Sequence, residues 1–192
     1  MTSIIILQAL QIIGERGEPA AAIQHLRKAL KEHPRYVEAH YLLGSLLLDQ
    51  SRLEEAEQEF RTAIKLNPDF APAYIALGSL RNRQGMFRQA EEFLEKGMAL
   101  DPEDWTARVE LVRALHRQGD LKEAERRGLE AHELNPSAPE VHLLLADVYV
   151  VEGASAKARQ EYEHFLALVP DGPLADKVRQ QIKRLEDAMG PK

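Results

Sequence analysis

Residues 37–68 read VEAHYLLGSLLLDQSRLEEAEQEFRTAIKLNP and contain two apolar patterns separated by a break at Ser51. Apolar residues recur in both patterns three and four positions apart, at Leu43, Leu46 and Leu47 and again at Leu53, Ala56, Phe60, Ala63 and Ile64. That spacing is typical of a helix face, and a strand with alternating side chains would not show it. Pro68 ends the second pattern, because proline disfavours helical backbone in the residue before it. The segment predicts a helical hairpin.

The same pattern recurs along the chain with a constant period of 34 residues. Prolines mark it at Pro34, Pro68, Pro102, Pro136 and Pro170. When the sequence is written in rows of 34 residues, alanines align in one column, at Ala22, Ala56, Ala90, Ala124 and Ala158. A column of turn residues does so at Gly17, Ser51, Gly85, Gly119 and Gly153. Three columns at one period indicate a protein built of repeats.

The period gives a domain organisation. We expect one continuous domain with hairpins at residues 3–36, 37–70, 71–104, 105–138 and 139–172, closed by a helix at residues 173–189. A hairpin of this size cannot bury its apolar face alone, so neighbouring hairpins should stack. The closing helix carries one apolar face, formed by Leu174, Val178, Ile182 and Leu185. The sequence predicts an all-α fold.

The repeats resemble the tetratricopeptide repeat (TPR) family over residues 3–172. The family pattern is matched best in the third repeat, by Tyr74, Leu77, Gly78, Ala90 and Pro102. The resemblance implies a right-handed α-solenoid (superhelix) of antiparallel helix pairs. It also implies that the first helices line a concave groove that binds an extended or helical segment of a partner protein.

Ile6, His40, Arg108 and His142 replace the leading aromatic residue of the family pattern, and two further positions depart from it in side-chain size. Gly128 stands where a large side chain is expected, and Phe165 stands where a small one is. We expect the neighbours of Gly128 to close over it imperfectly, so that Gly128→Ala raises the melting temperature if the site has room.

The register of the repeats selects candidate groove residues on the first helices. An apolar stripe is expected at Leu7, Tyr41, Ile75, Val109 and Leu143, and polar positions at Ser45, Ser79, Asn82, Arg83, Arg113, Arg117 and Asp147. Arginine beside apolar residues favours a partner segment with large apolar side chains and an acidic flank. Packing between repeats explains the stripe equally well, and internal pairing with Glu110 or Asp147 is the other interpretation of the arginines.

One known groove chemistry of the family is not expected. The carboxylate clamp of chaperone-binding members needs Lys, Asn and Arg at fixed places in three successive first helices. Those places hold Leu7, Gln11, Leu42, Pro72 and Ala76 in the first three repeats. We therefore do not expect an adaptor for chaperone tails.

Composition and motifs bear on other function classes. The formal net charge of -6 disfavours a nucleic-acid partner, which requires clustered Lys and Arg. No apolar run is long enough for a membrane span. There are no cysteines, and the seven histidines show no H-E-x-x-H pair or other metal-ligand spacing. We expect a binding scaffold without cofactor or metal, and no enzyme.

Several alternatives stay open. Ile4, Ile6 and Leu7 belong to a first helix that is apolar almost all round, which favours a homo-oligomer or another covering segment. A second interpretation is that the chain is a regulatory or assembly module cut from a larger protein. An RNA-binding helical repeat is the weakest alternative, because it would require a basic groove, whereas this chain is acidic and its repeats have a constant length of 34 residues. No basic region precedes the apolar start, so no signal peptide is expected; a complete chain would be cytoplasmic, and a fragment could come from a periplasmic or exported protein.

Overall fold

The computed structural model describes residues 19–189, which form ten α-helices and no strand. The all-helical fold predicted from the sequence is confirmed for these residues. The chain divides into two compact units at the junction of Asp101 and Pro102, and each unit is described by itself. Within 19–189, no helix combines the length and apolarity needed to cross a membrane.

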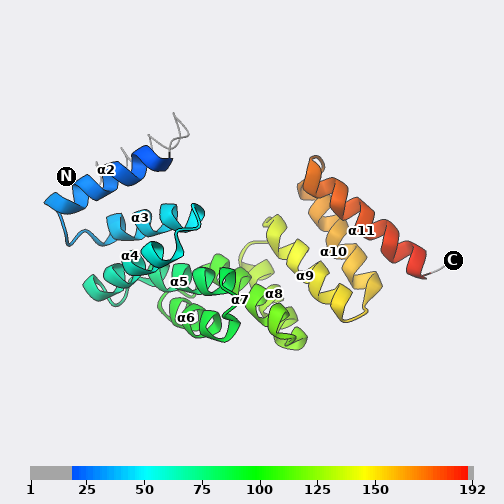
Figure 1. Ribbon diagram of the computed structural model, residues 1–192. Coiled ribbons are helices and arrows are strands. Elements are labelled where there is room, and N and C mark those ends of the chain that lie inside the picture. Colours follow the sequence, from blue (N-terminus) through cyan, green and yellow to red (C-terminus); the bar gives the residue numbers. More distant parts are fainter. Residues whose placement is uncertain (1–18, 190–192) are drawn as a thin grey trace. The chain divides into compact units, whose positions relative to one another are not determined.

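The first unit contains five described helices (Figure 1), namely α2 (Pro19–Glu32), α3 (Val37–Asp49), α4 (Leu53–Leu66), α5 (Ala71–Arg83) and α6 (Phe87–Leu100). Helices that follow one another along the chain pack together, and α3 also contacts α5. The shared core includes Leu26 of α2, Leu43 of α3, Phe60 of α4 and Leu77 of α5, all at most 1% exposed. Each apolar pattern in the sequence therefore faces its neighbours in the stack.

The second unit contains α7 (Trp105–Gln118), α8 (Leu121–Leu134), α9 (Pro139–Val151), α10 (Ser155–Leu168) and α11 (Pro173–Met189). Successive helices again pack together, and α7 also contacts α9. Its buried residues include Val141 and Leu145 of α9, Tyr162 of α10 and Val178 of α11.

The turns between paired helices repeat one backbone conformation. Ser51, Gly85, Gly119 and Gly153 have φ between 59° and 84°, in the left-handed region that glycine enters without steric cost. Within residues 19–189, Ser51 is the one non-glycine residue with positive φ. The turn column seen in the sequence thus marks a required backbone conformation.

The closing helix uses a face slightly different from the expected one. Val178 is 2% exposed and Ala175 is fully buried, and Ile182 and Leu185 pack on the neighbouring cluster. Leu174 is 47% exposed, so its assignment to this face was wrong. Adjacent helix residues point about 100° apart, and Ala175 takes the inward position at this end.

Candidate functional site

In the first unit, the apolar residues predicted for the groove are also packing residues. Tyr41 is half-buried, and its ring centroid lies 6.1 Å from that of Phe60 and 5.6 Å from that of Phe70. Ile75 is half-buried against Gly97, where an added Cβ would lie 2.6 Å from its Cγ1. Part of each side chain therefore packs in the helix interface, and the rest is exposed to solvent.

The polar residues predicted for this unit lie on the same two helices, α3 and α5. Ser45 donates a hydrogen bond to the carbonyl of Tyr41, at 3.0 Å, and remains half-buried like Ser79 and Asn82. Arg83 donates to the carbonyl of Leu48 at 2.8 Å, and its Nη2 lies 3.5 Å from Asp49 Oδ1. A cation at the C-terminal end of α3 complements the helix dipole. Arg83 thus has an internal role, although 45% of its side chain is exposed.

In the second unit, Val109 is only 6% exposed and belongs to the core, so it offers little surface to a ligand. Leu143 is half-buried against the cluster around Tyr162, and Asp147 accepts a hydrogen bond from the Tyr162 hydroxyl at 2.8 Å. These residues tie α9 to α10.

Two arginines of α7 remain on the surface of this unit. Arg113 has a side chain that is 48% exposed, and its Nε lies 4.0 Å from Glu110 Oε1. Arg117 is exposed, and within residues 19–189 it makes no hydrogen bond or ion pair. They are four positions apart in the sequence, so they lie one turn apart on one helix face. The predicted residues Ile4, Ile6 and Leu7 lie outside the described part of the chain.

Near the start of α3, α5, α7 and α9, a polar residue fixes the entry to the hairpin that the helix begins. His40, Tyr74, Arg108 and His142 each contact the carbonyl of the proline six residues earlier, at 3.0, 3.0, 2.7 and 3.3 Å. They occupy one column of the 34-residue period, where the family pattern has an aromatic residue. Three side-chain types thus perform one structural task.

Both histidines of this column also pair with a glutamate nineteen positions later. His40 Nδ1 lies 2.6 Å from Glu59 Oε2, and His142 Nδ1 lies 2.8 Å from Glu161 Oε2. Burial lowers the pKa of His40, but the hydrogen bonds to Glu59 and Pro34 and the charge of Glu59 together outweigh it. The pKa of His40 is therefore raised above its ordinary value of 6.5.

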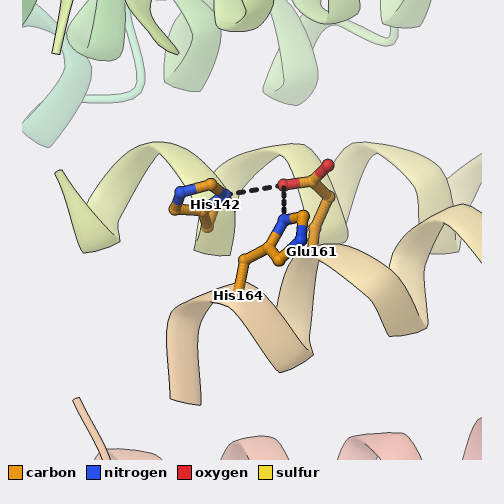
Figure 2. Close-up of side chains that lie close together, drawn as sticks. All are labelled: His142, Glu161 and His164. Atoms are coloured by element: carbon orange, nitrogen blue, oxygen red, sulfur yellow. Dashed lines mark hydrogen bonds and ion pairs between the residues drawn. The ribbon is translucent and has the colours of Figure 1, made fainter. Parts of the chain in front are cut away.

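The second of these pairs belongs to a larger group. Figure 2 shows His164 beside His142 and Glu161, with the same carboxylate oxygen facing both rings. His164 Nδ1 lies 3.7 Å from Glu161 Oε2, and one potential ligand atom from each of the three residues lies within 4.8 Å of the others. The His142 ring also contacts His132, with ring centroids 5.0 Å apart.

This group was not predicted from the sequence. His142 lies 19 positions before Glu161, so no short metal-binding motif contains all three residues. The signal that could have found it is Glu161-x-x-His164, which places two ligand types one helical turn apart. The repeat period then brings His142 beside Glu161, as it brings His40 beside Glu59.

Comparisons with known proteins place the fold in context. The structure is similar to that of PilW, a widely conserved type IV pilus biogenesis factor, with a TM-score of 0.84 and 18% identity, covering 98% of this chain and 91% of that one. It is similar to TTC0263, a thermophilic TPR protein in Thermus thermophilus, with a TM-score of 0.78 and 22% identity over 96% and 98% of the two chains. It is also similar to YrrB, a TPR protein with an unusual peptide-binding site, with a TM-score of 0.66 and 20% identity over 88% and 87%. Identities this low show a common fold alone.

Sequence comparison is more decisive about the family. No curated protein matches the chain. One family model of the tetratricopeptide repeat matches residues 15–80 and 82–127, and a second matches residues 126–173. These matches cover most of the chain, and the helices that they span pair as the repeat requires. The chain belongs to the tetratricopeptide repeat family.

Proposed function

We propose that this protein is an interaction scaffold that holds a segment of a partner protein against its first helices. Repeat solenoids offer extended surfaces to partners, and the family assignment supports a protein–protein interaction module. The observation that carries the finer proposal is the pair Arg113 and Arg117. Both are exposed on one face of α7, and the one contact between this pair and a carboxylate in residues 19–189 is the 4.0 Å approach of Glu110 to Arg113.

The chemistry of this face favours an acidic segment. A guanidinium can hold a carboxylate through two parallel hydrogen bonds, and two of them one turn apart can hold two acidic groups. Val109 is buried, so it adds little apolar surface beside them. Half-buried Leu143 in the same unit leaves part of its side chain for contact with a partner. The proposed ligand is an acidic segment with a few large apolar side chains.

A displayed peptide library selected on the whole protein tests the proposal. We expect the selected peptides to combine Asp or Glu with large apolar residues. The double variant Arg113→Glu with Arg117→Glu should weaken their binding about tenfold or more at low salt. Folding should change little, because exposed substitutions usually have small effects.

The matched control is Lys122→Glu with Arg88→Glu, which makes the same charge change at exposed positions of two second helices, α8 and α6. Its affinity should stay within about twofold of the parent, which separates a local contact from long-range charge. Equal loss in both variants would contradict a site on α7, and so would unchanged binding in the arginine variant.

A further inference from the structure

We propose that His142, Glu161 and His164 form a binding site for a divalent transition-metal ion, and that Zn²⁺ suits it best. Two imidazole nitrogens and one carboxylate oxygen are donors that zinc prefers, whereas calcium and magnesium require oxygen ligands. Two histidines and a glutamate with an open position form a known type of three-ligand zinc site. The proposal concerns a site separate from the arginine face of α7.

The spacing of the donors fits one ion. Zinc lies about 2.0–2.2 Å from nitrogen and oxygen ligands, so two ligands in a tetrahedral site lie about 3.4 Å apart. Glu161 Oε2 is 3.7 Å from His164 Nδ1 and 2.8 Å from His142 Nδ1. Binding requires the first distance to shorten by about 0.3 Å and the second to lengthen by about 0.6 Å. The two imidazoles, whose ligand atoms lie within 4.8 Å of each other, must also approach this spacing, and side-chain rotation can supply these shifts.

The second nitrogen of His142 supports its role as a ligand. Nε2 faces the carbonyl oxygen of Pro136 at 3.3 Å, and because a carbonyl can only accept, Nε2 carries the proton. Nδ1 shares a proton with Glu161 Oε2, 2.8 Å away, and a bound ion takes the place of that proton at the Nδ1 lone pair. Histidines that bind metals commonly donate their other N–H to a carbonyl or carboxylate in this way.

Burial gives the site a closed side and an open side. The side chains of His142 and Glu161 are 5% and 17% exposed, whereas that of His164 is 50% exposed. An ion can therefore enter beside His164, and water can complete its coordination there. His132, whose ring lies against His142, has a buried Nδ1 without a hydrogen-bond partner in residues 19–189, which adds a further polar atom near the group.

The repeats supply an internal comparison. The His40–Glu59 pair has the same contacts as His142–Glu161, so that pair alone is explained by packing. The second repeat has Thr62 where the fifth has His164, and the first repeat has Leu30 where the fourth has His132. The fourth and fifth repeats thus each add one imidazole around a pair that packing already positions.

The test is titration of the full-length protein, free of any histidine tag, with Zn²⁺ by calorimetry and with Co²⁺ by visible absorption. We expect one ion per chain, with visible absorption from Co²⁺ in the site. His164→Thr, which restores the second-repeat residue at an exposed position, should weaken binding at least about tenfold and leave the circular dichroism melt without metal unchanged. His40→Tyr, which removes the matched pair in the other unit, should leave metal binding unchanged.

A gain of binding provides a second measurement. Thr62→His places an imidazole one turn after Glu59 and should add a second, weaker site. The proposal is overturned if the parent protein binds no Zn²⁺, if His164→Thr binds as the parent does, or if His40→Tyr removes binding while His164→Thr does not.

Discussion

The δ2 methyl group of Leu145 occupies the space that a side chain at position 128 would need. A Cβ built on Gly128 lies 2.5 Å from Leu145 Cδ2 and 3.0 Å from its Cγ. Leu145 is 1% exposed and is held within the core of the second unit. The expectation of loose packing around Gly128 was wrong, because α9 of the next repeat fills the gap that the missing side chain leaves.

Gly128→Ala should therefore destabilise the protein. Alanine gains about 1 kcal/mol of helix propensity. Overpacking of a filled core costs typically 1–3 kcal/mol, so we expect a net loss of about 1 kcal/mol in the free energy of unfolding. Urea denaturation measures it. Combining Gly128→Ala with Leu145→Ala should cost less than the sum of the two single changes, by about 1 kcal/mol. A higher melting temperature for Gly128→Ala would show that Leu145 moves aside freely.

The pair His40–Glu59 should make stability depend on pH. The pKa of His40 is raised in the folded protein, since hydrogen bonds to Glu59 and Pro34 outweigh the effect of burial. A group of this kind contributes stability below its unfolded pKa of about 6.5, and the contribution is lost as pH rises through the folded pKa. Glu59→Gln should therefore destabilise the protein more at pH 5.5 than at pH 8.

Two measurements check this prediction. Nuclear magnetic resonance titration of the His40 ring should give a lower pKa in Glu59→Gln than in the parent protein. The control is Glu54→Gln, an exposed change on the same helix, which should leave the pKa of His40 unaltered. An equal loss of stability at both pH values would contradict the assigned role of Glu59.

The sequence alone was sufficient for the fold, because the period aligns residues that perform one task in each repeat. The turn column illustrates this, since Ser51 and Gly85 share the same left-handed backbone. Contacts that depend on the neighbouring repeat could not be predicted in this way. Leu145 fills the space at Gly128 only because of where α9 packs on α8.

The candidate sites show the same division. Helical register placed Arg113 on the surface of α7 and could not reveal that Val109, one turn earlier, is buried in the core. His142 and Glu161 come into contact only because α9 packs against α10, so no local sequence motif could predict the pair. The i,i+3 relation of Glu161 and His164 was visible in the sequence, but its third member was not.

The ion pair of Arg81 and Glu57 should stabilise the folded protein above about pH 5. Arg81 is 7% exposed and donates two hydrogen bonds to the Glu57 carboxylate, at 2.5 and 3.0 Å. The hydrogen bond from Arg81 is the largest cause that lowers the pKa of Glu57; burial opposes it, and Arg61 adds to it. Arg81→Leu should cost about 1–2 kcal/mol at pH 7, because it leaves a half-buried carboxylate with Arg61 alone.

The cost of Arg81→Leu should shrink in acid. A carboxyl whose folded pKa is lowered contributes stability above its ordinary pKa of 4.5, and this is lost as pH falls through the folded pKa. Denaturation at pH 7 and pH 3 tests the sign. Adding Glu57→Gln to Arg81→Leu should recover part of the loss at pH 7, since the half-buried carboxylate is then removed and the arginine left behind, Arg61, has a side chain that is 56% exposed. A cost that is independent of pH would assign the effect to packing instead.

The closing helix α11 should stabilise the second unit through Val178, whose side chain is 2% exposed against Tyr162 and Phe165. Removing two buried methyl groups in Val178→Ala should cost about 2 kcal/mol. Because solenoid stability is close to a sum over repeats and their interfaces, the loss should be local. Native-state hydrogen exchange should then show reduced protection in α9, α10 and α11, and little change in α3 to α6.

Leu174→Ala is the matched control on the same helix, since Leu174 is 47% exposed and should contribute less than about 0.5 kcal/mol. Equal effects of the two substitutions would mean that α11 packs through a face other than the one that carries Val178.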